Sequence, residues 1–378
     1  MIVGGIVIGL IVLVLLIVVH ELGHAIVARR NGVVVEEFGI GFPPRAWSKK
    51  LKNGILFTIN WLPLGGFVKL KGEHDAATGK GTYGAATFWQ KTKILLAGVA
   101  MNWIVAAILL MALSWVGLPK IVQNQFTMPG DTRIETSKVT LGKTLPGSAA
   151  EKAEFKQGDV VISINDKKIA STQEFIETTR GLAGNYATIA FERDGTPGVK
   201  RLMLGNDASK GVFGARIGQE ETIHATWSAP IVGIVTTGQL SWETFSGLGS
   251  LLGKLVTGTI QQFSPNEDIR DRAHKNIEEV SNSVAGPVGI LGVIFPSAQQ
   301  QGVKQIVLLT AVISLTLAVM NVLPIPALDG GRWWTLAVFR VLRKKLTKER
   351  EETIQAIGFL VLMGIIVLIT VSDVAKLW

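Results

Sequence analysis

Cysteine is absent from this chain of 378 residues. No disulfide can form, and any metal ion has to be held by histidine, aspartate or glutamate. Histidine is also scarce, at five residues, so a pair of histidines at a metal-ligand spacing rarely arises by chance. Charged residues make up 18% of the chain and hydrophobic residues 48%, with a mean hydropathy of +0.37. This composition excludes an ordinary soluble domain and indicates a membrane protein.

The net charge of +9 is typical either of nucleic-acid binding or of basic cytoplasmic loops. In a membrane protein the second explanation is sufficient. We therefore expect contact with a lipid bilayer and no nucleic-acid partner. The sequence also lacks internal repeats, which argues against a transporter or channel built from two symmetric halves.

Four apolar segments approach the ~20 residues that a bilayer requires. They are residues 2–24, 94–117, 305–323 and 355–372. No basic residue precedes the first segment, which favours a retained span over a cleaved secretory signal. Basic residues gather after the first and third spans, so both of those loops are predicted to be cytoplasmic. The termini and the long segment between the second and third spans then lie outside.

That long segment has two predicted parts. A small soluble module is expected at about 122–219, with strands at Val160–Ile164 and Tyr186–Arg193 and a helix at Ser171–Gly181. From 223 to 257 apolar residues recur at helical spacing. This amphipathic helix either lies on the membrane surface or packs on the soluble module. The polar residues 262–283 predict a connector.

The first cytoplasmic loop contains two β-prone runs, Ile55–Leu62 and Phe67–Leu70. Residues 63–66 (Pro-Leu-Gly-Gly) separate them, which predicts a β-hairpin. A short exposed strand beside an active site can hold a substrate in extended form by strand addition. The alternative is a membrane-adherent hairpin with only a packing role.

The strongest chemical signal is the sequence His20-Glu21-Leu22-Gly23-His24 at the end of the first span. Residues four apart share a helix face, so both imidazoles can reach one metal ion. Glu21 is one position on and can reach a water molecule at the metal, take its proton and pass it to a leaving amine. Two histidines and a glutamate at the end of an apolar span are costly unless they bind or react.

A catalytic zinc site usually has three protein ligands, so one more is needed. The candidate is Asp329, just beyond the third span and on the same predicted side as the histidines. Pro324 and Pro326 break the helix, so that the chain can turn back. Gly330 and Gly331 allow a close backbone approach. Taken alone, this segment favours a turn with an Asx-type hydrogen bond; together with His-Glu-x-x-His and the matching topology it favours a metal ligand.

Together, His-Glu-x-x-His and Asn-x-x-Pro-x-Pro-x-x-Asp-Gly resemble the site-2 protease family, within it the bacterial regulator-of-sigma-E proteases. Further matching stretches are residues 64–69, Phe88-Trp89, Leu96-Ala97-Gly98 with Asn102, and residues 283–289 around Gly286-Pro287. The resemblance covers nearly the whole chain.

The resemblance implies a mainly α membrane protein with four transmembrane helices, a membrane-associated β-hairpin and one inserted α+β PDZ domain. It implies Zn²⁺ on His20, His24 and Asp329, with Glu21 as general base. The hairpin would present substrate, with Gly65, Gly66 and Phe67 as candidate contacts. Asn321 is a further candidate substrate contact, or else an interhelical hydrogen-bonding group.

The soluble module resembles a permuted PDZ domain at residues 146–150 and 157–165. Its closing segment, Gly211, Val212, Phe213 and Gly214, resembles a carboxylate-binding loop, which would bind a chain end through backbone N–H groups. The alternative is a module that only gates access. Sigma-E type members often have two such modules, whereas this chain has room for one.

The expected domains are 1–117 (first two spans, His-Glu-x-x-His and hairpin), 122–219 (PDZ-like), 220–304 (amphipathic helix and connector) and 305–378 (last two spans and the Asp-Gly motif). The expected function is an intramembrane zinc metalloendopeptidase of a bacterial inner membrane, with its active site toward the cytoplasm. Expected substrates are single-span proteins pre-trimmed by another protease, such as anti-sigma factors or signal-peptide remnants. The rival is a non-proteolytic, membrane-tethered PDZ scaffold with structural zinc, although such zinc usually has four protein ligands.

Overall fold

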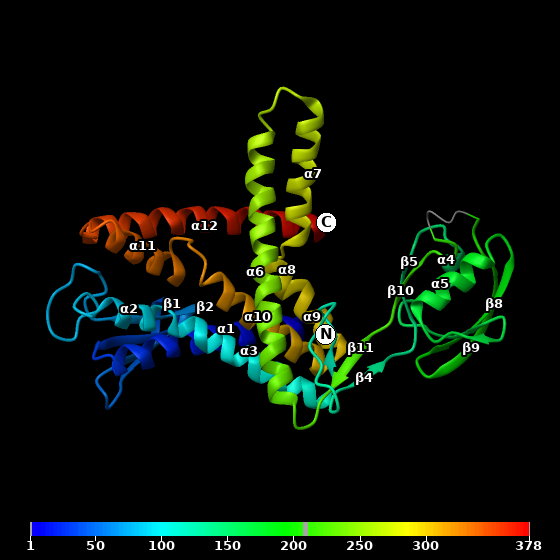
Figure 1. Ribbon diagram of the computed structural model, residues 1–378, viewed down its shortest axis with the longest axis horizontal. Helices are drawn as coiled ribbons and strands as arrows, with labels where there is room; N and C mark the ends of the chain where they lie inside the picture. Colours follow the sequence, from blue (N-terminus) through cyan, green and yellow to red (C-terminus); the bar gives the residue numbers. More distant parts are fainter. Residues whose placement is uncertain (1, 207–210, 378) are drawn as a thin grey trace. The chain divides into compact units, whose positions relative to one another are not determined.

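The computed structural model describes residues 2–206 and 211–377 (Figure 1). The chain divides into two compact units. One unit holds the chain up to Leu113 and from Pro230 onward, and the other is Ser114–Ala229. Among the described residues, four helices are long and apolar enough to cross a membrane. The predicted number of spans is therefore confirmed, and the chain is a multi-pass membrane protein.

The spans lie in five helices, because the second span is broken at Leu96. They are α1 (Ile2–Arg30), α2 with α3 (Phe88–Leu95 and Ala97–Val116), α10 (Val303–Met320) and α12 (Lys348–Leu377). The first and last run well beyond the predicted apolar segments. Hydropathy locates only the apolar centre of a span, whereas Arg, Lys, Glu and Gln in the flanks are good helix formers and extend it.

Between α1 and α2 lies a two-stranded sheet of β1 (Val35–Lys50) and β2 (Leu56–Leu70). The predicted hairpin is wrong in detail, because its two runs do not pair with each other but belong to one strand, β2. Both runs pair with β1, so that Phe38 has both Phe57 and Val68 as partners. β1 was missed because its acidic start and its two consecutive prolines do not look like a strand.

The segment after residue 228 forms a pair of long helices, α6 (Ala229–Gln261) and α7 (Glu267–Ser283), which lie side by side (Figure 1). The prediction that 262–283 is a connector is wrong for most of its length. Asn266 caps the start of α7 through its side chain, and acidic residues follow in the first turn, where they favour a helix. α7 is polar overall, and Ala273 is the one fully buried residue among its described side chains, so the helix gave little apolar periodicity.

Short helices complete this unit. α8 (Pro287–Gly289), a π-helical turn η1 (Ile290–Ile294) and α9 (Phe295–Gln301) follow α7, and α11 (Asp329–Val341) follows α10. η1 and α9 pack against α1. On α12, Asp373 accepts a hydrogen bond from the backbone N–H of Gly289 at 2.7 Å, so the last span is joined to this short-helix segment.

The second unit contains two antiparallel sheets. The larger has the order β10-β5-β6-β8-β9 with β7 on β6, and the smaller has the order β3-β11-β4. The strands are β3 (Leu118–Pro119), β4 (Arg133–Thr136), β5 (Thr140–Thr144), β6 (Val160–Ile164), β7 (Lys167–Lys168), β8 (Tyr186–Arg193), β9 (Thr196–Met203), β10 (Ala215–Gly218) and β11 (Glu221–His224). Two helices accompany them, α4 (Ala149–Lys152) and α5 (Thr172–Gly181).

A buried core joins the larger sheet to its helices, with Phe175 of α5 fully buried among Ile164, Ile189 and Phe213. Three predicted elements are confirmed here. β6 and β8 have the predicted bounds, and α5 begins directly after Ser171, whose side chain caps it.

Candidate metal centre and catalytic cavity

His20 and His24 lie on one face of α1, and each is only 8% exposed. The helix continues through both residues because the apolar run is uninterrupted and contains no proline. The ring of His24 is oriented by its second nitrogen, since Nδ1–H donates to the carbonyl of Ile94 at 2.7 Å. This hydrogen bond leaves the Nε2 lone pair free to face a metal ion.

Asp329 reaches the histidines because α10 ends at Met320 and the chain reverses before α11 begins. The prolines of the sequence motif predicted this break. The reversal is held by the N–H of Gly330, which donates to the carbonyl of Asn321 at 2.7 Å. Gly331 has no space for a side chain, because a Cβ there would lie 2.0 Å from the carbonyl oxygen of Ile325. Asp329 is thereby placed at the first position of α11.

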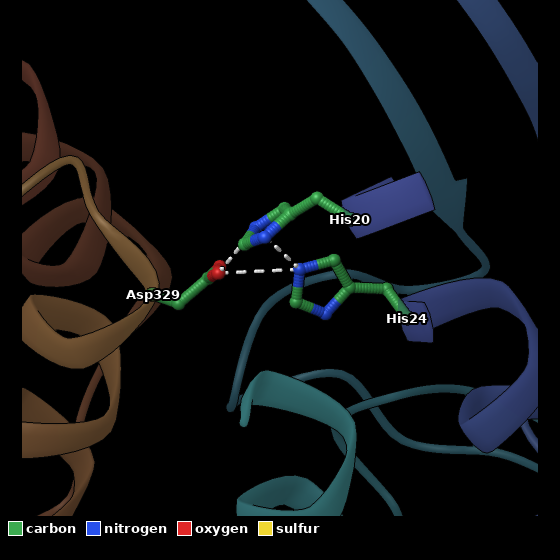
Figure 2. Close-up of side chains that lie close together, drawn as sticks. All are labelled: His20, His24 and Asp329. Carbon is green, nitrogen blue, oxygen red and sulfur yellow. Dashed lines mark hydrogen bonds and ion pairs between the residues drawn. The ribbon is translucent and has the colours of Figure 1, made fainter. Parts of the chain in front are cut away.

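The structure brings the three predicted residues together, with their side chains pointing toward one another (Figure 2). Oδ2 of Asp329 lies 3.0 Å from Nε2 of His20 and 3.2 Å from Nε2 of His24, and the two Nε2 atoms are 3.2 Å apart. Ligand atoms of a tetrahedral zinc ion, each bonded at about 2.0–2.1 Å, lie about 3.3 Å apart. Two imidazole nitrogens and a carboxylate at these separations fit zinc and leave a fourth position open.

The charge state of Asp329 also fits a ligand. Burial alone would raise the pKa of its carboxyl, but the nearby charges and hydrogen bonds of His24 and His20 hold that pKa well below its ordinary value. The carboxylate is therefore ionised at neutral pH, as metal coordination requires.

Glu21 lines a cavity of about 220 Å³ together with His24 and Asp329. The walls also include residues that the sequence did not identify, among them Glu73, Tyr83 and Arg332. Arg332 lies one helical turn after Asp329, pairs with Glu73 at 3.3 Å and stacks on the ring of Tyr83 at 4.8 Å. The i, i+3 spacing from Asp329 was the only local signal for Arg332.

The β-sheet forms another wall of this cavity through Phe67. Gly66 lies against α1, since a Cβ at Gly66 would be 3.5 Å from Cγ of Glu21. The strand that carries the predicted contacts Gly65, Gly66 and Phe67 is therefore adjacent to Glu21.

Asn321 lies at the end of α10, and its side chain donates to the carbonyl of Leu317 in its own helix at 2.9 Å. Its backbone carbonyl holds the turn before Asp329, as described above. The structure thus places Asn321 next to the ligand loop.

In the second unit, residues 211–214 close a small cavity of about 70 Å³ against α5. Gly211 and Gly214 adopt positive φ angles of 78° and 77°, which glycine tolerates. The side chains of Val212 and Phe213 are buried in the core, so that backbone rather than side chain faces any ligand of this loop.

The model of peptidase family M50 matches residues 8–365. This chain belongs to peptidase family M50. Among its relatives, zinc metalloprotease RasP of Geobacillus kaustophilus is 25% identical over an alignment 444 residues long, which covers 96% of this chain and 95% of the relative. The regulator of sigma-W protease RasP of Bacillus subtilis is 24% identical over 450 residues, covering 96% of each.

Membership of the M50 family confirms the resemblance drawn from the sequence motifs. This M50 protein is a zinc metalloprotease that acts within membranes, and its cofactor is Zn²⁺. The protease interpretation is thereby favoured over the non-proteolytic scaffold.

Proposed function

We propose that His20, His24 and Asp329 hold the catalytic zinc of this M50 metalloprotease and that Glu21 is its general base. The observation that carries this proposal is the set of ligand-atom separations of 3.0–3.2 Å, with Glu21 lining the same cavity. Zinc at this position would supply a Lewis acid that polarises the scissile carbonyl and makes water a better nucleophile.

The protein's own residues position the substrate and transfer the proton. The Glu21 carboxylate takes a proton from the attacking water and returns it to the leaving amine. The edge of β2 at Gly65, Gly66 and Phe67 holds the substrate backbone in extended form by strand addition, beside Glu21. Asn321, one residue beyond α10 and next to the ligand loop, contacts the same substrate.

The substrates are single-span membrane proteins, cut where the helix unwinds near its cytoplasmic end. Unwinding is needed because helical hydrogen bonds shield the scissile amide. The relatives include a regulator of sigma-W protease, which supports a substrate of the anti-sigma-factor class; signal-peptide remnants have the same single-span form. Prior trimming by another protease would remove the outer domain of such a substrate.

The proposed domain plan assigns residues 122–219 to a PDZ-like domain between the two pairs of spans. The cavity between α5 and residues 211–214 supports binding of a chain end there. The proposed orientation has the active site toward the cytoplasm of a bacterial inner membrane and the PDZ-like domain outside, as the basic loops indicate.

The proposal is tested with purified protein in detergent, as wild type and as Glu21→Gln. Each is incubated with a tagged single-span substrate, and bound zinc is measured in the same samples. We expect wild type to cut within the span and Glu21→Gln to retain zinc while cutting about 10²–10⁴-fold more slowly, which is the usual contribution of general acid–base catalysis. Undiminished cutting by Glu21→Gln would show that another group is the base.

A further inference from the structure

Asn102 of α3 lies behind the proposed zinc centre, on the side of His20 that faces away from the metal position. Its side-chain amide nitrogen is 3.4 Å from Nδ1 of His20, and the residue is only 1% exposed. Its amide oxygen, Oδ1, is buried and has no hydrogen-bond partner in the described part of the chain. A buried acceptor without a partner is costly, so this amide needs an explanation.

The protonation of the two ring nitrogens of His20 determines which atom of the Asn102 amide should face Nδ1. Coordination through Nε2, the atom that faces His24 and Asp329, requires the imidazole proton to be on Nδ1. Nδ1–H then needs an acceptor, as Nδ1–H of His24 has in the carbonyl of Ile94. An amide NH₂ directed at Nδ1 would instead favour the other tautomer, with the proton on Nε2, where it opposes metal binding.

We infer that Asn102 is a positioning residue for zinc, whose amide oxygen accepts a hydrogen bond from Nδ1–H of His20. Rotating the amide by half a turn exchanges its oxygen and nitrogen and changes no other contact. The partnerless acceptor then meets the donor that needs it. After the rotation the NH₂ group occupies the former position of Oδ1, where no hydrogen-bond partner is present among the described residues. Only the contact with Nδ1 of His20 therefore distinguishes the two orientations of the amide. This inference rests on the proposed zinc centre.

The backbone around Asn102 is fixed independently of its side chain. The hydroxyl of Ser314 on α10 donates to the backbone carbonyl of Asn102 at 2.8 Å, and Ser314 is fully buried. This bond joins α3 to α10 without touching His20. Ser314→Ala therefore provides a matched control, since it removes a structural tie at the same residue while leaving the amide in place.

The test measures zinc affinity of the full chain in detergent by competition with a fluorescent chelator, for wild type, Asn102→Leu, Asn102→Asp and Ser314→Ala. Loss of an outer partner of a metal-bound histidine usually weakens metal affinity 10–100-fold, and we expect that loss for Asn102→Leu. The carboxylate introduced by Asn102→Asp offers only acceptor atoms, so this variant should bind zinc at least as tightly as wild type. Ser314→Ala should remain within about two-fold of wild type.

Wild-type affinity in Asn102→Leu would overturn the inference, and so would an equal loss in Asn102→Asp with its helix content unchanged. Should the aspartate variant not fold, ¹⁵N-histidine NMR of zinc-loaded wild type decides instead. The inference requires a hydrogen-bonded Nδ1–H signal that is removed by His20→Ala and shifted in Asn102→Leu. A wild type that binds no zinc would overturn the proposed function itself, which is a different result from zinc binding that ignores Asn102.

Discussion

Gly98 of α3 faces the Nε2 atoms of the two histidines. A Cβ at this position would lie 2.5 Å from Nε2 of His24 and 2.6 Å from Nε2 of His20. Real Cβ atoms do not approach other atoms so closely, and these nitrogens are the proposed zinc ligands. The proposed zinc centre therefore requires a residue without a side chain at position 98.

Replacing Gly98 by alanine should lower zinc affinity by at least about ten-fold, because the new methyl group occupies the space between the two ligand nitrogens. Zinc retained through chelator competition measures this. Gly364→Ala on α12 is the matched control, since nothing lies within 4 Å of an added Cβ there and alanine favours the helix. Unchanged zinc affinity in Gly98→Ala would show that α3 shifts to admit the methyl group.

The sequence predicted the residues that belong to one local pattern. Helical spacing alone predicted His20, Glu21 and His24. Asp329 was predicted from a loop rich in proline and glycine, at the end of the third span and on the same predicted side of the membrane as the histidines. The sequence assigned no role to Gly98, Asn102 or Arg332. Their importance depends on which faces of α1, α3 and α11 meet, and helix periodicity does not specify a partner face.

At the scale of elements, β2 lies against α1, which carries the proposed base Glu21, at Gly66. A larger side chain at Gly66 would meet Ile17 at 3.3 Å and the carbonyl of Gly39 at 3.2 Å, in addition to Glu21. The separation of sheet and helix at this point therefore sets both the width of the cavity and the position of the proposed base.

Gly66→Val should reduce cleavage of a single-span substrate by at least about ten-fold while zinc binding persists, because small displacements of positioned groups weaken catalysis strongly. Cleavage rate and zinc content are measured on the same sample. Ile59→Val, at a half-exposed position of the same strand, introduces the same residue away from α1 and should leave the rate unchanged. Normal cleavage by Gly66→Val would argue against a role for this strand in the site.

The second unit has an ion pair at one end of its larger sheet, between Asp159, just before β6, and Arg193, the last residue of β8. Both carboxylate oxygens of the fully buried Asp159 accept from the guanidinium of Arg193, at 2.6 and 2.7 Å. Burial alone would raise the pKa of Asp159, but these hydrogen bonds, that from the backbone N–H of Lys156, and the positive charges hold the pKa below its ordinary value.

A carboxyl whose pKa is depressed in the folded state stabilises that state above its unfolded pKa of about 3.9 and loses this effect as the pH falls through the folded pKa. Amide-exchange protection of β8, corrected for intrinsic rates, should therefore fall below about pH 4. Asp159→Asn should already show reduced protection at pH 7 and a weaker further loss in acid. Asp166→Asn, at an exposed turn of the same unit, should behave as wild type; a wild-type profile in Asp159→Asn would contradict the assignment.

Elements were predictable where a complete local signal was present. The helix predicted to start at Ser171 is α5, and the strand predicted at Tyr186–Arg193 is β8. β1 and α7 were missed for the opposite reason. Pro43-Pro44 opposes a strand locally and is tolerated only because β1 bends there, and the polar α7 becomes a helix by packing Ala273 against Gly258 of α6.

At the scale of the whole molecule, the distribution of basic residues predicts how the four spans are oriented in the membrane. Eleven of the 38 basic residues lie in residues 29–93, from the end of α1 through the loop into α2. His20 and His24 precede this basic stretch by only a few residues. If the loop is cytoplasmic, the proposed zinc centre lies near the cytoplasmic face, because α1 continues to Arg30 without a break. The question of how the four spans are oriented is then also the question of which side of the membrane the active site faces.

The absence of cysteine makes that question directly measurable, because each single-cysteine variant has only one thiol. Lys50→Cys places it at an exposed position of β1 and Lys168→Cys at an exposed position of β7 in the second unit. In spheroplasts of an expressing bacterium, a membrane-impermeant maleimide should label Lys168→Cys at once and Lys50→Cys only after the membrane is opened, because basic loops are retained inside. Zinc content and cleavage confirm that both variants are intact. The reverse labelling order would place the basic loop and the catalytic centre on the outer side, and would require substrates to be cut from that face.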